Sequence, residues 1–360
     1  MHSNTNGSRR IDLRSPRVLL PLGALGGLLI LFALLGIFRL GRGSGRWVEP
    51  FAEAPGDSPC YAGAGNGLAV ASENVLRLYN AKGECIRQEA ASLTEPLCAA
   101  DAYLSAYYSS GAPDITVVYS SGEEKTLETE GSVNFVHVNE NGLLTVLTEK
   151  EGCKGCIMVY DRDLTPLFRW EAQSGIPVSA RVSQKDRLCI LCLSDYGSTA
   201  HFYRIDSAEP LGVYPSSGEL LLDFGFLSDG TAAFISEERL LLLEEDGSEL
   251  SSLSLGGHRP TAWSLTGAWA AAGTDGQELL LLAPDGTEHR AAVSAVPEEM
   301  SQNRQFLLVL YPTEATLYSA ELEDLLSCQT DGSVLRVFLR TDGTALFCGV
   351  DGTDKVDFSR

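Results

Sequence analysis

The sequence predicts an all-β fold, a β-propeller of eight four-stranded blades, preceded by one transmembrane helix. The main observation is a repeat of about 40 residues, marked by a hydrophobic residue that closes a short apolar run just before a turn. The marks are Tyr79, Tyr119, Tyr160, Tyr203, Leu243, Leu282, Tyr318 and Phe358. Four strand-like segments fit into each interval, and that is the content of one propeller blade. The second observation is an uncharged apolar run near the N-terminus.

The apolar run spans residues 18–38 and predicts a membrane-spanning helix. Its 21 residues carry no charge. At about 1.5 Å per residue such a helix is about 30 Å long, which is the thickness of the hydrocarbon core of a bilayer. A secretory signal is the alternative, but the run is longer than the apolar region of a signal and no small-residue cleavage pattern follows it. We therefore expect an uncleaved anchor at residues 18–39 and a linker at residues 40–46.

The charges around the anchor suggest its orientation. Residues 1–17 contain four arginines and residues 39–46 contain three, so the positive-inside rule favours a cytoplasmic N-terminus. The long body after a single anchor favours the same arrangement. We expect a single-pass protein of the cell membrane, with residues 1–17 as a short basic cytoplasmic tail and residues 47–360 outside the cytoplasm.

Each repeat is expected to contain a hairpin around its hydrophobic mark. Residues 74–79 and 84–89, for example, flank a turn at residues 80–83. Asp-Gly pairs supply the positive φ angles that such turns need. These pairs begin at Asp229, Asp246, Asp275, Asp285, Asp331, Asp342 and Asp351. An apolar strand rich in small residues precedes each hairpin, and a weaker strand precedes that one.

The last repeat lacks its outer strand. It supplies three strands within residues 334–358, and the sequence then ends. A strand at residues 47–52 would complete that sheet, and Pro50 suits an edge strand, where a lost N–H is tolerated. Because this pairing removes unprotected sheet edges, we expect one propeller domain at residues 47–360 that closes through its first strand. Seven blades is the alternative, since residues 296–330 form the least regular repeat.

Three hairpins carry a family resemblance. Residues 78–90, 159–172 and 281–293 share an apolar–turn–apolar pattern and resemble the degenerate repeats of PQQ-like propellers. The whole layout is similar to an uncharacterised bacterial family of N-terminally membrane-anchored, divergent PQQ-like or WD40-like β-propeller proteins, a domain of unknown function. The tryptophan of regular PQQ-type repeats occurs at the expected place only as Trp170, so the resemblance does not imply a cofactor-dependent dehydrogenase. WD40 signatures are absent apart from an isolated Gly257-His258.

The charge of the chain is uneven. Residues 1–46 carry seven basic side chains and one acidic one, whereas residues 47–360 carry 20 basic and 47 acidic side chains, a sum of −27. A body this acidic repels phosphate backbones, so we expect no nucleic-acid partner. The charge is typical of a well-solvated surface, and an acidic surface that binds cations or amines is the alternative.

Nine cysteines are the main candidates for chemistry. Cys153 and Cys156 form a CxxC in a turn, rather than at the helix N-terminus that activates redox thiols. Cys189 and Cys192 lie on one strand and point to opposite faces, so they cannot share a metal ion. Structural thiols are the main interpretation, with a local disulfide at 153/156, metal binding and redox catalysis as alternatives. The other five are expected in the core: Cys60, Cys85, Cys98, Cys328 and Cys348.

No other constellation in the sequence points to catalysis. The five histidines occur singly, and the sequence contains no nucleophile elbow, no phosphate-binding glycine loop and no calcium loop. Pairs of adjacent acidic residues fall in or beside predicted turns, where carboxylates are usually solvated. The sequence therefore names no catalytic, cofactor-binding or metal-ligating residue and predicts no cofactor.

Two functions remain open at this level. The first is a non-catalytic scaffold that binds a protein or another cell-envelope partner through its turns and is held in the membrane by residues 18–39. Aromatic candidates for the contact are Tyr107, Tyr108, Tyr196 and Trp263, although packing between blades is the more common role for each such residue. The alternative is an extracellular glycan-active hydrolase or lyase, which requires two inward carboxylates that converge at the propeller channel.

Overall fold

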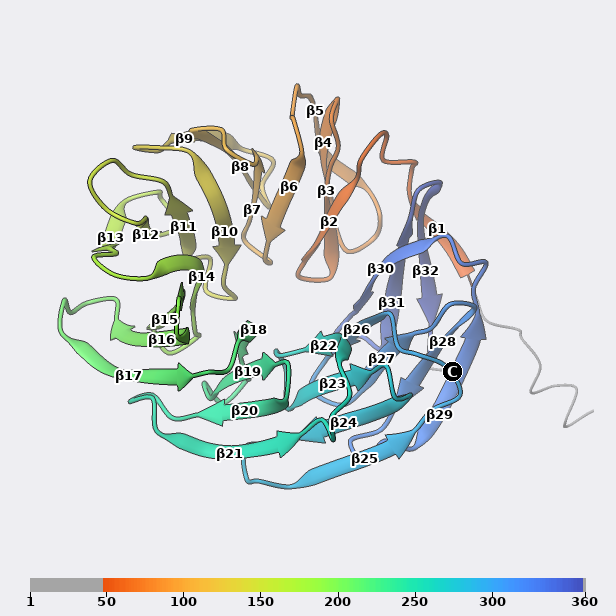
Figure 1. The fold of residues 1–360 in the computed structure, drawn as a ribbon. Coiled ribbons are helices and arrows are strands. Elements are labelled where there is room, and N and C mark those ends of the chain that lie inside the picture. The colour runs from red at the N-terminus through yellow and green to blue at the C-terminus, as the bar shows by residue number, and fades with distance from the viewer. Residues whose placement is uncertain (1–47, 359–360) are drawn as a thin grey trace, which may run out of the picture. The chain divides into compact units, whose positions relative to one another are not determined.

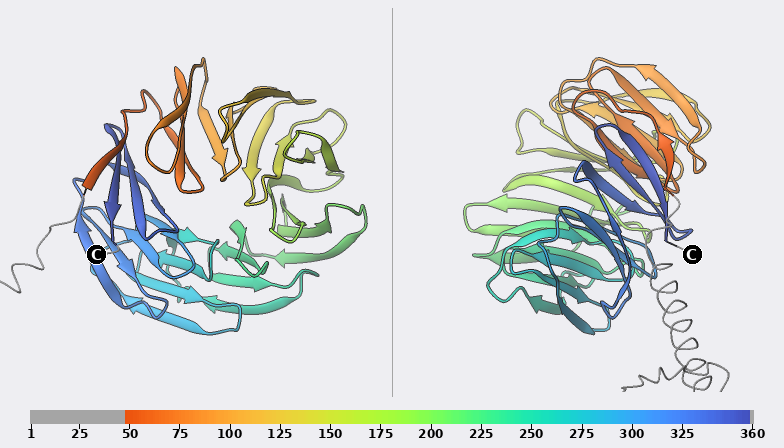
Figure 2. Two further views of the ribbon diagram at one scale, coloured as in Figure 1. Left: turned by 180° about the vertical axis from the view of Figure 1, so that it is seen from behind. Right: turned by 90° about the vertical axis from the view of Figure 1, so that its right-hand side faces the viewer.

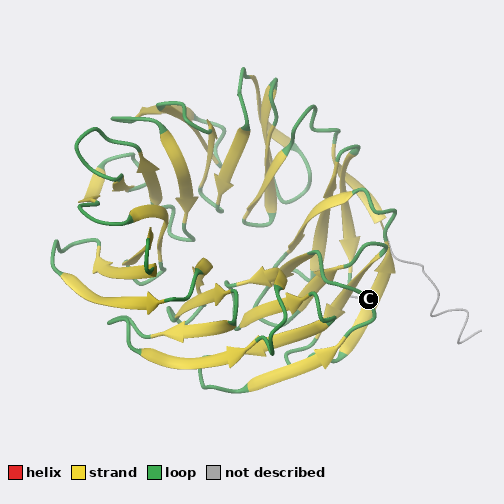
Figure 3. Ribbon diagram, viewed as in Figure 1, coloured by secondary structure: helices red, strands yellow, loops and turns green. Residues whose placement is uncertain are grey.

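The computed structural model describes residues 48–358, which form 32 β-strands in eight four-stranded sheets. The sheets stand around a common centre like the blades of a propeller (Figure 1), and the described residues contain strands and loops but no helix (Figure 3). This confirms the predicted all-β propeller, with eight blades rather than seven. Among the residues described, no helix is long and apolar enough to cross a membrane. The helix predicted at residues 18–39 lies outside the described part of the chain.

Each blade is an antiparallel sheet in which chain order runs from the centre of the ring to its rim (Figure 1). The innermost strands are β2 (Cys60–Ala64), β6 (Pro96–Ala100), β10 (Val133–Val138), β14 (Ile176–Val182), β18 (Leu221–Phe226), β22 (Pro260–Ser264), β26 (Glu299–Gln302) and β30 (Val334–Leu339). The second strands are β3 (Gly67–Ala71), β7 (Leu104–Ser109), β11 (Leu144–Thr148), β15 (Arg187–Ser194), β19 (Ala232–Ser236), β23 (Ala270–Thr274), β27 (Leu307–Leu310) and β31 (Thr344–Gly349).

The outer half of each blade is the predicted hairpin. The third strands are β4 (Val75–Tyr79), β8 (Asp114–Tyr119), β12 (Cys156–Tyr160), β16 (Gly197–Arg204), β20 (Arg239–Leu243), β24 (Glu278–Leu282), β28 (Glu314–Tyr318) and β32 (Gly352–Asp357). The outermost strands are β5 (Cys85–Ala90), β9 (Glu124–Glu128), β13 (Pro166–Glu171), β17 (Pro210–Ser217), β21 (Glu249–Ser254), β25 (Glu288–Ala292), β29 (Asp324–Gln329) and β1 (Val48–Ala52). We number the blades from 1 (β2–β5) to 8 (β30–β32 with β1). The hydrophobic marks therefore lie at the ends of the third strands.

Alternating strand direction places the turns on two faces of the ring, which the right-hand view of Figure 2 shows from the side. The first and third turns of every blade lie on one face, which we call the odd-turn face. The second turn and the link to the next blade lie on the other, the even-turn face. Val48 pairs with Val356 near the end of β32, so the described chain both begins and ends on the odd-turn face.

Blade 8 closes the ring with strands from both ends of the described chain. Its order is β1-β32-β31-β30, and Pro50 lies in the outermost strand, opposite Asp354. The ion pair between Lys355 and Glu49, at 2.9 Å, lies beside this pairing. On the other side of the seam, the Tyr61 hydroxyl of blade 1 donates to the Gly349 carbonyl of blade 8 at 2.7 Å.

The core lies between neighbouring blades. The middle strands of each sheet are buried on both faces, so their sequences are continuous apolar runs rather than alternating ones. In β20, Leu240 and Leu242 pack with residues of blade 6, whereas Leu241 and Leu243 pack with residues of blade 4. Each blade is therefore fixed by both of its neighbours, and no blade has an independent core.

The Asp-Gly turns have the backbone that the sequence predicts. Gly247 has a φ of 81°, and Asp246 Oδ1 accepts the N–H of Ser248 at 2.9 Å. The same bond from a Ser or Thr two residues on recurs at Asp229, Asp285, Asp331 and Asp342. At Asp275-Gly276 the positive φ of 58° falls instead on Gln277. The carboxylate and the following residue thus hold the turn together.

Candidate functional site

The eight innermost strands surround the centre of the ring (Figure 1). Each carries a polar or sulfur-bearing side chain that is linked to the neighbouring strand by a hydrogen bond or by charge. We call these residues the inner-strand ring: Cys60, Cys98, His137, Arg181, Asp223, Trp263, Glu299 and Arg336. Asp223 and Glu299 are the two carboxylates on the innermost strands. A catalytic role for the channel would therefore depend on them.

One group in this ring joins three consecutive blades. Arg181 Nη2 donates to Asp223 Oδ1 at 2.9 Å, and Trp263 Nε1 donates to Asp223 Oδ2 at 3.0 Å. The Arg181 guanidinium also lies 5.2 Å from the centre of the Phe224 ring. Both carboxylate oxygens of Asp223 are therefore occupied, as in a structural ion pair.

A second pair joins blades 7 and 8. Arg336 Nη1 lies 2.8 Å and 2.9 Å from the two oxygens of Glu299. Burial raises the pKa of Glu299, and the charge and hydrogen bonds of Arg336 offset only part of that effect. This carboxyl group is thus engaged with an arginine through both of its oxygens.

His137 is the neutral member of the inner-strand ring. Burial, assisted by the charge of Arg181, lowers the pKa of His137 to about 3. Its Nδ1 is buried without a hydrogen-bond partner. The imidazole is therefore uncharged at physiological pH and does not compete with Arg181 for Asp223.

The remaining two members are cysteines that face each other across blades 1 and 2. Cys98 Sγ lies 3.6 Å from Cys60 Sγ and 3.4 Å from the Cys60 carbonyl oxygen. The hydrogen bond from Cys98 lowers the pKa of Cys60 to about 7 against the effect of burial, and Arg336 contributes in the same direction. The shared proton and burial raise the pKa of Cys98 well above its usual value.

A different kind of site lies on the odd-turn face over blades 1 to 3. Two pockets of about 250 and 280 Å³ adjoin there, and Tyr103, Leu104 and Ser120 line both. The Arg162 guanidinium stacks on the Tyr103 ring at 3.5 Å from its centre. Tyr103 is 42% exposed.

The neighbours of Tyr103 complete this surface. Lys125 Nζ lies 5.0 Å from the centre of the Tyr119 ring, and the Tyr119 hydroxyl donates to the Arg162 carbonyl at 2.8 Å. We call Tyr103, Tyr119, Ser120, Lys125 and Arg162 the Tyr103 surface. It presents aromatic rings and cations on a hollowed, partly exposed face, where the acidic side chains of Glu123 and Asp163 line the same pocket.

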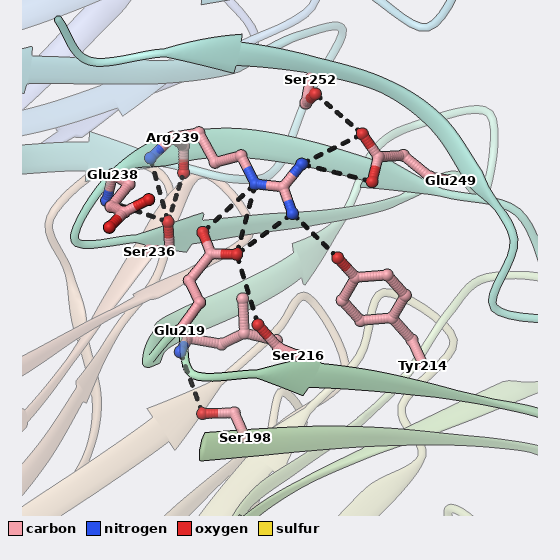
Figure 4. Close-up of polar contacts among 10 residues, drawn as sticks. Ser198, Tyr214, Ser216, Glu219, Ser236, Glu238, Arg239, Glu249 and Ser252 are labelled. Carbon is pink, nitrogen blue, oxygen red and sulfur yellow. Dashed lines mark hydrogen bonds and ion pairs between the residues drawn. The ribbon is translucent and has the colours of Figure 1, made fainter. Parts of the chain in front are cut away.

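A polar cluster joins blades 4 and 5 at the even-turn face (Figure 4). Arg239 donates to both oxygens of Glu219 and of Glu249, and to the Tyr214 hydroxyl at 3.0 Å. Burial alone would raise the pKa of Glu219, but the hydrogen bonds from Arg239 and Ser216 outweigh it and lower that pKa. Every donor of the guanidinium is used within the protein, so this cluster is a clamp between blades.

The four aromatic residues predicted as surface contacts differ in how far they are exposed to solvent. Tyr196 is 85% exposed in the second turn of blade 4, and Trp263 is half-buried at the inner-strand ring. Tyr107 and Tyr108 are not surface contacts: they are 1% and 6% exposed and pack between blades, which is the alternative role given for them above. The reason is that the second strand of a blade packs on both faces, so alternate residues are equally buried.

The cysteines also depart from expectation in part. All nine are thiols, and Cys189 and Cys192 point toward different blades, as predicted. Cys85 is exposed rather than in the core. Within residues 48–358, no group of three or more His, Cys, Asp or Glu side chains is arranged to hold a metal ion.

The sequence patterns predict neither the inner-strand ring nor the Tyr103 surface. A signal for part of the ring exists in the sequence, because Cys60 and Cys98 lie one repeat apart and so occupy similar places in successive blades. The same holds for Arg181, Asp223 and Trp263. Residues one period apart occupy equivalent positions in successive blades, so this spacing marks them as candidates for contact across a blade interface.

Comparisons with solved structures show the same architecture. The C-terminal WD40 domain of Sif2 is 12% identical, with a TM-score of 0.63 over 87% of this chain and 99% of that one. BamB from Moraxella catarrhalis is 11% identical, with a TM-score of 0.57 over 86% of this chain and 99% of that one. A chain of the mitotic checkpoint complex is 12% identical, with a TM-score of 0.53 over 86% of this chain and 94% of that one. At these identities the likeness concerns the fold alone.

Curated proteins offer no match to this sequence. A family model matches residues 52–254, which cover blades 1 to 5 and more than half of the chain. That model is described as a family of unknown function, DUF5711. The chain belongs to the DUF5711 family.

Proposed function

We propose that this protein is a membrane-anchored, extracytoplasmic propeller that works as a protein-interaction scaffold, with the Tyr103 surface as its binding site. The observation that carries the proposal is the stacked Tyr103–Arg162 pair beside two adjoining pockets. Tyrosine and arginine are enriched at the energetic centres of protein interfaces, where they fill pockets and lose their water. A chain of the mitotic checkpoint complex has this fold, which supports a role in a protein assembly.

The inner-strand ring offers less support for the glycan-active alternative. Such an enzyme needs two carboxyl groups that are free to act as acid and base or nucleophile. Asp223 is bonded to Arg181 and Trp263, and Glu299 is bonded to Arg336. Carboxylates that are fully used in holding blades together favour a structural role for the channel.

The proposed anchor suggests where the partner lies. An anchor at residues 18–39 would confine the propeller to the membrane, so we propose a partner that is itself a membrane protein.

Site-specific photocrosslinking in native cells tests the binding site. A photoreactive amino acid at Tyr103 of the full chain should form a discrete adduct with one membrane protein. The matched control is the same amino acid at Tyr196, which is exposed on the even-turn face. Arg162→Ala should weaken the adduct at Tyr103 several-fold. Identical adducts from both positions, or none from Tyr103, would rule the Tyr103 surface out as the binding site.

Thiol labelling tests the proposed topology separately. Cys85 is exposed, so a membrane-impermeant maleimide should label it on intact cells, and Cys85→Ser should lose that label. Labelling of Cys85 only after the cells are lysed would place the propeller in the cytoplasm.

A further inference from the structure

We propose that Cys60 and Cys98 form a redox site that takes disulfides as its substrate class and closes reversibly into a disulfide between blades 1 and 2. The inference does not depend on the scaffold function, since it concerns chemistry on the inner strands rather than binding on the odd-turn face. It rests first on geometry. The two sulfur atoms lie 3.6 Å apart on neighbouring innermost strands.

The packing around the pair permits the bond. β2 and β6 lie directly against each other, and the side chains beside the cysteines on these strands are small: Ala62, Ala64 and Ala100 join the same cluster. A disulfide bond is about 2.05 Å long, so the sulfurs need to approach by about 1.5 Å. Both cysteines are half-buried rather than sealed in the core, which leaves a path for a reagent.

The charges around the pair favour a thiolate on Cys60. The positive charge of Arg336 on β30 lowers the pKa of Cys60, although Arg336 is also paired with Glu299 on β26. The other titratable neighbours are uncharged at neutral pH. They are Tyr61, Tyr107, Tyr108 and Cys348, and each has a raised pKa.

In other cysteines of the propeller the pKa of the thiol is raised rather than lowered. Burial raises the pKa of Cys156, Cys189 and Cys192, and of the exposed Cys85 as well. A thiolate is the nucleophile in disulfide exchange, and its fraction at neutral pH sets the rate. Cys60 therefore stands out as the attacking group and Cys98 as the resolving one.

The exchange balances with a disulfide as oxidant. The Cys60 thiolate attacks one sulfur of RS–SR′, the S–S bond breaks, and R′S⁻ leaves with the electron pair. Once Cys60 is in the mixed disulfide, it no longer holds Cys98 in a shared hydrogen bond, so Cys98 gives its proton to R′S⁻. The Cys98 thiolate then attacks the Cys60 sulfur and expels RS⁻. Two protein thiols are oxidised and one disulfide is reduced.

Redox titration of the full chain in detergent tests the site. The protein is equilibrated with glutathione and glutathione disulfide in varied ratios, alkylated, digested and analysed by mass spectrometry. We expect a peptide pair joined through Cys60 and Cys98 that forms as the disulfide fraction rises and disappears when the ratio is reversed. The matched control is Cys85→Ser, which should keep the joined pair unchanged.

Two variants separate the roles of the cysteines. Cys98→Ser should accumulate glutathione on Cys60, because the resolving thiol is gone, whereas Cys60→Ser should leave Cys98 unmodified under the same conditions. Circular dichroism confirms that both variants are folded. Absence of the joined pair at every ratio, or equal modification of Cys98 in Cys60→Ser, would overturn the proposal.

Discussion

At the residue scale, the repeat lets one blade serve as a control for another. Asn139 and Asn303 begin the first turns of blades 3 and 7, where their Oδ1 atoms accept N–H groups of the turn. Their Nδ2 groups donate to the next blade, to the carbonyls of Ser183 at 3.1 Å and Arg340 at 3.0 Å. The oxygen of the asparagine amide thus stabilises the turn, and its nitrogen makes a hydrogen bond to the next blade.

Asp101 occupies the same place in blade 2 but has no amide to donate. Its Oδ1 accepts the N–H groups of Tyr103 and Leu104, while Oδ2 is buried without a partner. Burial raises the pKa of Asp101, and the two N–H groups offset only part of that effect. A raised pKa in the folded state means that stability is present at low pH and is lost as the pH rises through that pKa.

We therefore predict that Asp101→Asn stabilises the protein at pH 7. The gain should be about 1 kcal/mol, since an orphaned buried oxygen is replaced by an amide that can donate. It should shrink toward zero in acid, where Asp101 is protonated in the wild type. Thermal unfolding of both proteins from pH 4 to pH 7 measures it.

The reverse substitution in blade 3 is the matched control. Asn139→Asp places a carboxylate oxygen against the Ser183 carbonyl, so it should destabilise the protein at pH 7 by about 1–3 kcal/mol. If Asp101→Asn unfolds more readily than the wild type at pH 7, the equivalence of the two positions is wrong.

At the element scale, links between blades rest on single side chains. The Arg239 clamp joins the outer strand of blade 4 and the link after it to blade 5 (Figure 4). The side chains of Arg239 and Glu219 are 25% and 14% exposed, so neither is free to be solvated instead. A planar guanidinium has five donors, so it can bond both oxygens of two carboxylates and a hydroxyl as well.

Arg239→Lys is therefore expected to be destabilising although it keeps the charge. An ammonium has three donors and cannot engage both carboxylates in pairs, so the free energy of unfolding should fall by about 1–3 kcal/mol. Urea denaturation measures this change. Arg204→Lys is the control, because the Arg204–Asp206 pair is exposed and exposed ion pairs contribute little to stability. Equal effects of the two substitutions on the free energy of unfolding would contradict the role of Arg239 as a clamp between blades 4 and 5.

At the scale of the whole molecule, the ring is held closed at one seam. Phe51 of β1 is 6% exposed, its ring lies 6.4 Å from that of Tyr79 in blade 1, and the Arg340 guanidinium of blade 8 lies 5.7 Å from it. Arg340 also donates to the Ala81 carbonyl at 2.8 Å. One short strand thus connects the first and last blades.

Truncation of the Phe51 side chain should weaken the contact between blades 1 and 8. Phe51→Ala is expected to cost about 3–5 kcal/mol, because it leaves a cavity that two blades share. Val48→Ala on the same strand should cost little, since Val48 is 56% exposed. Unfolding measurements, with limited proteolysis of blade 8, distinguish the two. Similar stability of both variants would show that Phe51 does not hold the seam.

The all-β propeller and its turns follow from the sequence alone. Strand periodicity and Asp-Gly turns are local properties, so the third strands end at the hydrophobic marks and the predicted turns have positive φ at Gly247 and Gly343. Burial was harder to predict. Tyr107 and Tyr108 look like an exposed aromatic pair, but a strand packed between two blades has no solvent face.

Which residues meet depends on how the blades pack in three dimensions. Cys60 and Cys98, or Asp223 and Trp263, are each about one repeat of 40 residues apart, and a repeat shows that positions are equivalent without showing that they touch. Contact requires the twist of the blades and the closure of the ring. The Tyr103 surface has the same origin, since its residues come from turns of neighbouring blades. The sequence determined the blades, and the packing of one blade on the next decided the sites.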